Sequence, residues 1–263
     1  LLINLGGGVI SDLGGFIASI FKRGIPYINI PTSIMGIIDA SIGGKTGVNF
    51  KHQKNQLGSF HLPNDILIST IFLPSLPQVE LINGWAEAIK YAYLNQNLKY
   101  LPIDLKLDTS EVNIEIIQNC AEFKREIVNR DYNESGLRKI LNFGHTIGHA
   151  IESYSQEINQ PIGHGYAIAI GLLVEMQISI SVNGCSENDL SQTLKQLISK
   201  YYYPLPFDLP NVVNLEKYLN ADKKNSDGKI KMVLCNREFQ FDYDCIVSSL
   251  EIENALQNEV WLK

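Results

Sequence analysis

The spacing of apolar residues changes near residue 77, and this change limits the folds open to the chain. Before it, apolar runs of strand length, separated by glycine-rich turns, occur at residues 1–5, 26–31 and 65–69. Continuous apolar runs of this length are typical of parallel strands covered on both faces. Residues 11–22 fit a helix between the first two runs, so this region predicts a strand–helix–strand unit.

After residue 77, apolar residues recur at the i, i+3, i+4 and i+7 spacing of amphipathic helices. The segments with this spacing are residues 81–94, 112–131, 140–154, 166–182 and 186–201. We therefore expect an α/β domain with a parallel sheet at residues 1–76, followed by an all-α domain at residues 77–263. Because the chain opens inside an apolar run, we expect the α/β domain to be incomplete, with a segment preceding it.

Composition narrows the classes of function. The chain has 263 residues, 45% of them hydrophobic, which is enough for a genuine core. Its net charge of −6 provides no overall attraction for nucleic acid or anionic lipid. No apolar run approaches the ~20 residues of a membrane-spanning helix, and no signal peptide is recognisable, so we expect a cytoplasmic protein. The four cysteines lack CxxC spacing and are expected to be reduced packing residues.

Two glycine-containing turns have the composition of phosphate sites. The triple glycine at residues 6–8 follows a strand and precedes a helix, so its amides could approach a pyrophosphate, although a simple tight turn is equally compatible. Beside Gly43 and Gly44, a phosphate monoester could be held by Lys45, Lys54 and Asn55; the alternative is a solvated loop. The Gly-Gly-Lys-Thr run lacks the earlier glycine of a P-loop, which argues against nucleoside triphosphate hydrolysis.

Three of the five histidines lie between residues 145 and 164. His145 and His149 are four residues apart on a predicted helix and share a face, and His164 is flanked by glycines. A zinc site could use either or both of the helical histidines, with a further ligand from elsewhere. Structural histidines are the alternative. Thr146 replaces the general base of the HExxH motif, which argues against a metallopeptidase.

Other polar residues on the predicted helices are ambiguous when read alone. Glu87 and Lys90 lie three apart on an apolar helix, and a surface ion pair is the simplest account of them. Lys124 and Arg138 could equally be ordinary exposed charges, and Asn142 has no pattern of its own.

Seven segments of the chain together resemble the 3-dehydroquinate synthases, in the order of that family and over nearly the whole length. They are GGGVISDLGGF, KRGIPYINIPTS, DASIGGKTGVNFKHQKN, LPQVELINGWAEAIK, ESGLRKILNFGHTIGHAIES, GHGYAIAIG and DKKNSDGKIKMVL. The resemblance implies a nucleotide-binding α/β domain followed by an α-helical metal-binding domain. It also implies a phosphate-eliminating lyase that uses zinc and NAD to convert 3-deoxy-D-arabino-heptulosonate 7-phosphate into 3-dehydroquinate in the shikimate pathway.

The same resemblance implies roles for residues by position. The implied metal ligands are Glu87, His145 and His164, with Zn²⁺ as the metal and Co²⁺ as a substitute. The groups implied to hold substrate hydroxyls and manage protons are Asp39, Lys90, Asn142 and His149. The implied contacts to substrate phosphate and carboxylate are Arg23, Lys45, Asn55, Lys124, Arg138 and the pair Lys223 and Lys224. The implied NAD contacts are Gly7, Gly8, Asp12, Thr32, Ser33, Lys54 and Ser75.

Four residues bear on substrate and assembly. Lys124 and Arg138 resemble the pair that grips the substrate carboxylate, which favours an acid over the neutral sugars of 2-deoxy-scyllo-inosose or 2-epi-5-epi-valiolone synthases. Arg23 resembles an arginine that reaches into a neighbouring subunit, which implies a homodimer. Tyr166 stands where the family usually has Glu, and loss of that carboxylate could alter metal binding. A related cyclase with another substrate, or a non-catalytic paralogue, is the alternative.

Overall fold

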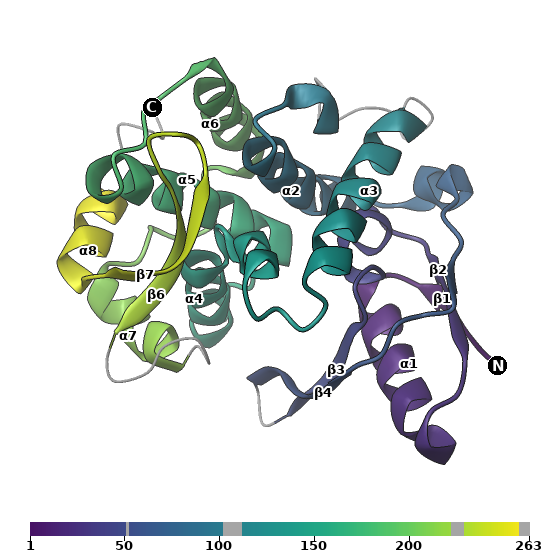
Figure 1. Cartoon of the computed structure of the whole chain (residues 1–263). Coiled ribbons are helices and arrows are strands. Elements are labelled where there is room, and N and C mark those ends of the chain that lie inside the picture. Colours follow the sequence, from purple (N-terminus) through teal and green to yellow (C-terminus); the bar gives the residue numbers. More distant parts are fainter. Residues whose placement is uncertain (51–52, 102–111, 222–228, 258–263) are drawn as a thin grey trace. The chain divides into compact units, whose positions relative to one another are not determined.

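The structure is a computed structural model that describes residues 1–50, 53–101, 112–221 and 229–257 (Figure 1). The chain forms two compact units that alternate along the sequence. Unit 1 comprises Leu1–Ala88 and Lys99–Ser135, and unit 2 comprises Ile89–Leu98 and Gly136–Lys263. The predicted class, a parallel sheet followed by a helical domain, is confirmed, but the second domain is not all-α, because residues 230–247 form an antiparallel hairpin. The boundary at residue 77 stays a prediction, because helix α2 (Gln78–Leu94) belongs partly to each unit.

Unit 1 contains the predicted parallel sheet, with strands β1 (Leu2–Gly6), β2 (Tyr27–Pro31) and β5 (Asp65–Ile66) in the order β1-β2-β5. Helix α1 (Gly8–Ile20) connects β1 to β2, which confirms the strand–helix–strand unit. The helix begins before the predicted residue 11, at the last of the three glycines. Because Gly6 pairs with Pro31, both strands end at the same edge of the sheet, next to the start of α1.

Within the residues described, one face of β1 carries exposed apolar side chains, so the expected cover on both faces stays a prediction for this strand. The exposed residues of β1 are Ile3 and Leu5. Asn4 points to the other face, where it is buried and donates a hydrogen bond to Asn29 Oδ1 at 2.9 Å. Helix α1 covers that face so closely that a Cβ on Gly14 would lie 1.9 Å from Asn4 Oδ1. The described part of unit 1 therefore covers one side of β1.

Unit 1 also contains a hairpin in a region where the sequence analysis predicted no strands. Strands β3 (Lys45–Phe50) and β4 (Gln53–Phe60) pair antiparallel, with Lys45 opposite Phe60. The two backbones approach closely where Gly47 faces Gly58, since a Cβ on Gly58 would lie 2.5 Å from the carbonyl oxygen of Thr46. Unit 1 is completed by the π-helical turn η2 (Gly36–Ala40), the 3₁₀ turns η1 (Phe21–Arg23) and η3 (Thr70–Ser75), and α3 (Ile114–Arg130). The 3₁₀ turn η4 (Leu98–Tyr100) lies at the boundary, with Leu98 in unit 2.

Unit 2 is built around one buried helix, α5 (His164–Val182). Its other elements are the 3₁₀ turn η6 (Leu137–Asn142), α4 (His145–Glu157), α6 (Asp189–Tyr202), α7 (Val212–Ala221), α8 (Ser249–Gln257) and the antiparallel hairpin of β6 (Ile230–Cys235) and β7 (Phe241–Val247). Figure 1 shows α4 beside α5. Among the described helices, α5 has the length and apolarity to cross a membrane, but 72% of that window is buried, as in a core helix.

The helix predicted at residues 140–154 is in fact two elements, η6 and α4, separated at Gly144. Gly144 has φ +79°, a left-handed conformation that favours glycine. A Cβ there would lie 2.6 Å from Leu172 Cδ2, and a Cβ on Gly171 would lie 2.1 Å from the carbonyl oxygen of Gly144. The start of α4 and the middle of α5 are therefore in backbone contact, and neither glycine leaves room for a side chain.

We expect Gly171→Ala to lower the free energy of unfolding by about 3 kcal/mol, because the new methyl group must force the two backbones apart. Ser181→Ala, on the exposed side of the same helix, serves as the control and should change stability by less than about 0.5 kcal/mol. Urea unfolding followed by circular dichroism measures both. Equal stabilities of the two variants would contradict the close contact.

Candidate functional site

The structure brings three histidines of unit 2 together. His145 and His149 lie in the first two turns of α4, and His164 is the first residue of α5. One ring nitrogen from each lies within 4.8 Å of the others, and their ring centroids are 5.1 to 5.7 Å apart. The two predicted histidine ligands, His145 and His164, thus lie close enough to share a metal ion, with His149 beside them.

Hydrogen bonds orient two of these rings. Nδ1 of His145 lies 3.2 Å from the carbonyl oxygen of Phe143, and Nδ1 of His164 lies 3.1 Å from Oε2 of Glu152. Both oxygens are acceptors, so we assign the ring proton to Nδ1 in each case. Nε2 of each ring then keeps its lone pair, which a metal ligand must supply. The arrangement fits a divalent metal that prefers imidazole nitrogen, such as zinc.

Glu152 supplies a carboxylate that the sequence analysis did not predict. It is buried on α4, one turn after His149, and its acceptor faces His164 of the neighbouring helix. Its position three residues after His149 was the available signal, since that spacing places both on one face. Tyr166 does not take this place. Its ring packs edge-to-face against Tyr202, with centroids 5.2 Å apart.

Glu87 and Lys90 are both buried in α2, with 0% and 1% of their surface exposed. The account of a surface ion pair is therefore wrong. Lys90 Nζ lies 5.2 Å from the ring centroid of Tyr91. A buried carboxylate is costly unless a cation or metal balances it, so burial is compatible with Glu87 as a ligand. Glu87 belongs to unit 1 and the histidines to unit 2, and the set of three ligands stays a prediction.

Three charged residues of unit 1 form one group. Lys124 Nζ of α3 donates to the backbone oxygen of Asp39 at 2.6 Å and to its Oδ1 at 2.5 Å. Burial is the main cause that raises the pKa of Asp12 to about 7, and the negative charge of Asp39 adds to the rise. The positive charge of Lys124 lowers this pKa and so opposes the shift. Asp12 of α1 therefore titrates near neutral pH. The predicted catalytic residue Asp39 and the predicted NAD contact Asp12 thus share one electrostatic environment.

Lys45, at the start of β3, forms an ion pair with Glu134. Glu134 was not predicted, and no local pattern marks it, because the two residues are far apart in sequence. The other residues of the predicted phosphate pocket lie partly or wholly outside the described structure. Asn55 and Lys54 lie in β4, but their side chains are not in the described part. The lysines at 223 and 224 lie outside the described residues.

Four of the predicted NAD contacts gather where β1 and β2 end. A Cβ on Gly7 would lie 3.1 Å from Ser33 Oγ, and the amide of Thr32 donates to the carbonyl oxygen of Gly6 at 2.9 Å. Gly8 begins α1, whose first turn has neither a side-chain cap nor an acidic residue. A helix start of this kind at the carboxyl edge of a parallel sheet is suited to a phosphate.

The remaining predicted residues are placed individually. Arg138 is 2% exposed and Lys124 is 8% exposed, so the account of ordinary surface charges is wrong for both. The clamp that they were predicted to form stays a prediction, because Lys124 belongs to unit 1 and Arg138 to unit 2. Asn142 is the last residue of η6 and half-buried. Arg23 and Ser75 are exposed, and their predicted roles also stay predictions.

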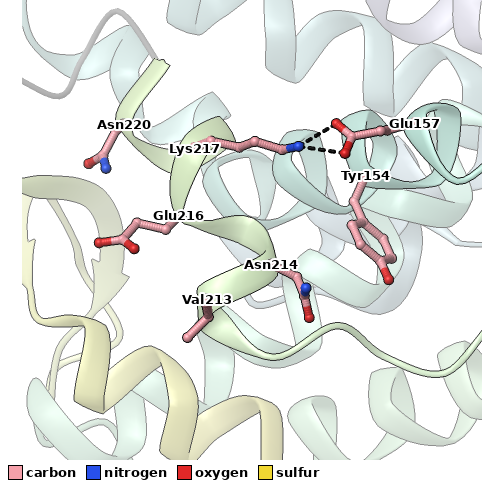
Figure 2. Close-up of a pocket in the computed structure, with 7 residues that line it drawn as sticks. All are labelled: Tyr154, Glu157, Val213, Asn214, Glu216, Lys217 and Asn220. Carbon is pink, nitrogen blue, oxygen red and sulfur yellow. Dashed lines mark hydrogen bonds and ion pairs between the residues drawn. The ribbon is translucent and has the colours of Figure 1, made fainter.

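A surface pocket of about 430 Å³ lies elsewhere in unit 2, where the end of α4 meets α7 (Figure 2). It is lined by Tyr154, Glu157, Val213, Asn214, Glu216, Lys217 and Asn220. Lys217 Nζ and Glu157 Oε2, 2.5 Å apart, form an exposed ion pair there. The pocket is at the opposite end of α4 from His145, so it is separate from the histidine cluster.

Comparisons with known proteins agree with this geometry. The family model "3-dehydroquinate synthase N-terminal" matches residues 1–83, and "3-dehydroquinate synthase C-terminal" matches residues 84–225. The 3-dehydroquinate synthase of Parabacteroides distasonis is 43% identical over 238 residues, covering 89% of this chain and 67% of that protein.

Two solved structures of sugar-phosphate cyclases share the fold. The 2-epi-5-epi-valiolone synthase of Streptomyces hygroscopicus, with NAD⁺ and Zn²⁺ bound, has a TM-score of 0.82 and 27% identity, covering 97% of this chain and 71% of that one. A 2-deoxy-scyllo-inosose synthase with carbaglucose-6-phosphate, NAD⁺ and Co²⁺ has a TM-score of 0.82 and 26% identity, covering 97% and 72%. Since both halves match their family models and curated relatives are matched over about two thirds of their length, the chain belongs to the 3-dehydroquinate synthase family.

Proposed function

We propose that the chain carries out the reaction of its family, the cyclisation of 3-deoxy-D-arabino-heptulosonate 7-phosphate to 3-dehydroquinate with release of phosphate. The observation that carries this proposal is the cluster of His145, His149 and His164, in which hydrogen bonds direct the metal-binding nitrogens of two rings. A chain that had lost the activity would be under no constraint to keep these rings and their acceptors together.

The metal ligands in this proposal are His145, His164 and Glu87. Zinc suits them because it prefers imidazole nitrogen and carboxylate oxygen, and Co²⁺ is an alternative. When bound, such a cation would acidify a substrate hydroxyl and polarise a carbonyl. His149 is the most exposed of the three histidines, so we assign it to proton transfer with the substrate.

NAD is the proposed second cofactor and would accept and return a hydride when bound. The start of α1 offers backbone amides and the positive end of the helix dipole to its pyrophosphate, and Gly7 and Gly8 add no side chain there. The complete proposed set is Gly7, Gly8, Asp12, Thr32, Ser33, Lys54 and Ser75. NAD⁺ together with Zn²⁺ or Co²⁺ is bound in the two related cyclase structures, which supports the same pair here.

The substrate is a small sugar phosphate in this family, and the finer assignment rests on charge. We assign its phosphate to Lys45, Asn55 and one of Lys223 and Lys224, and its carboxylate to Lys124 and Arg138. Arg138 is buried, and a guanidinium is suited to bind a carboxylate with two hydrogen bonds, which favours an acid over a neutral sugar. Asp39, Lys90 and Asn142 are assigned to the substrate hydroxyls and their protons. A cytoplasmic homodimer, with Arg23 reaching the neighbouring subunit, completes the proposal.

Purified protein supplied with zinc and NAD should release phosphate from the seven-carbon acid phosphate without net accumulation of NADH, because the hydride returns to the product. Phosphate assays and absorbance at the NADH band measure the two quantities. Release from a neutral sugar phosphate alone would favour the related-cyclase alternative. No release from either substrate, together with no bound zinc, would favour the non-catalytic paralogue.

His145→Ala should remove both zinc and activity, whereas His149→Ala should retain zinc and lose turnover, by about 10²–10⁴-fold for the loss of a proton-transfer group. Metal content after dialysis separates the two variants before any activity is measured. If His149→Ala also loses its zinc, then His149 is a ligand, and the assignment of Glu87 must be reconsidered.

Arg138→Ala should weaken binding of a carboxylate substrate by about 2–5 kcal/mol, because Arg138 is buried and its charge would be shielded from water. The Michaelis constant of the acid substrate is the measurement. Arg125→Ala is the matched control, since Arg125 forms an exposed pair with Glu122 on α3 and should leave this constant unchanged. An unchanged Michaelis constant for Arg138→Ala would favour the neutral-sugar branch.

A further inference from the structure

Glu175 is a buried charge in the most apolar helix of unit 2. It is the one charged residue between Tyr166 and Val182, and it has 0% of its surface exposed. Burying a carboxylate costs several kcal/mol unless hydrogen bonds or opposite charge compensate it. An isolated charge at the centre of a core helix therefore requires a structural or functional reason.

Three backbone amides compensate this carboxylate, and all belong to the start of α4. Oε2 accepts from Gly144 N at 2.7 Å, while Oε1 accepts from Thr146 N at 3.1 Å and Ile147 N at 3.2 Å. These are amides of the N-cap residue and of the first helical turn, which lack partners within the helix itself. Glu175 of α5 therefore caps the N-terminus of α4, in the role that an N-cap side chain of α4 itself usually has.

α4 cannot supply this cap itself. Its N-cap residue is Gly144, which has no side chain, and a Cβ there would lie 2.6 Å from Leu172 Cδ2. The usual N-cap residues Ser, Thr, Asp and Asn are therefore excluded by the contact with α5. The acceptor has to come from α5, and its negative charge also balances the positive end of the α4 dipole.

The contact connects the two helices that carry the histidines. His145 is the first residue of α4, His149 lies one turn later, and His164 begins α5, the helix of Glu175. The ring centroids of His145 and His164 are 5.7 Å apart, and fraying of the first turn of α4 would move His145 relative to His164. Capping from α5 holds that first turn against the helix of the other ligand.

We propose that Glu175 is a positioning residue for the histidine cluster, which keeps His145 and His164 in register for one metal ion. This inference rests on the proposed function, because it assumes that both histidines bind the metal. Glu175 acts through the backbone of α4 and does not touch the metal or the substrate. A carboxylate is required, because its three backbone partners at the start of α4 are all donors. A glutamine side chain would direct its own N–H groups toward a backbone N–H group there.

The test replaces Glu175 with its neutral isostere and measures metal binding. Glu175→Gln should bind Co²⁺ about 10–100-fold more weakly than the parent, the usual effect of losing a group that orients metal ligands. Affinity is read from the visible absorption of bound Co²⁺ in competition with a chelator. Circular dichroism and thermal unfolding of the metal-free protein show whether the variant is folded.

Ser179→Ala is the matched control. Ser179 is also buried on α5, one turn after Glu175, and its Oγ donates to the carbonyl oxygen of Glu175 at 2.7 Å and accepts from Cys235 N at 3.0 Å. The substitution perturbs α5 without touching the cap of α4. It should lower the unfolding temperature while leaving Co²⁺ affinity unchanged.

The outcomes separate the two proposals. A folded Glu175→Gln variant with parental Co²⁺ affinity, or with no greater loss than Ser179→Ala, overturns the role of Glu175 alone. If Glu175→Gln does not fold, Glu175→Asp decides, because it keeps the charge on a shorter side chain; an intermediate affinity supports the role and parental affinity overturns it. A parent protein whose Co²⁺ binding does not depend on His145 overturns the histidine site and the inference that depends on it.

Discussion

The histidine cluster depends on a backbone contact between α4 and α5. Three glycines make this contact: a Cβ on Gly171 would lie 2.1 Å from the carbonyl oxygen of Gly144 and 2.6 Å from the amide nitrogen of Gly148. Helices separated by ordinary side chains lie about 8–10 Å apart, whereas these two touch. Because His145 and His149 extend from the first turns of α4, and His164 from the first residue of α5, the contact brings all three rings together.

Across this close helix pair, each helix supplies a carboxylate to the other. Glu152 of α4 accepts from Nδ1 of His164, and Glu175 of α5 accepts from the first amides of α4. Both carboxylates are buried, at 5% and 0% exposure, and each is compensated by donors of the opposite helix. The polar groups that orient the rings therefore belong to the same helix pair that carries them, and any change in the packing of the pair changes the geometry of the site.

Periodicity predicted the parallel strands of unit 1 and four of the five helical segments, because burial of one face or stripe determines both patterns. It failed where local backbone conformation decided the outcome. The helix expected at residues 140–154 is broken by the left-handed conformation of Gly144, which only the contact with Leu172 explains. The β3–β4 hairpin was missed because its strands are rich in glycine and polar residues. Among site residues, the shared face of His145 and His149 follows from helical spacing, whereas the partner of Lys45, Glu134, is distant in sequence and has no local signature. Glu175 did carry a signal, as a lone charge in an apolar segment.

Tyr166 raised the hypothesis of a non-catalytic paralogue, since a tyrosine replaces the glutamate usual in the family. That hypothesis assumed that His164 loses its nearby carboxylate. His164 has Glu152 at 3.1 Å, so its ring orientation does not depend on residue 166. Tyr166 packs against Tyr202 of α6, a buried ring, and its effect is therefore on the packing of α5 against α6. The replacement removes an acidic group from the start of α5, while the buried acceptor of the His164 ring stays in place. Tyr166 therefore gives no physical reason to expect a degenerate metal site.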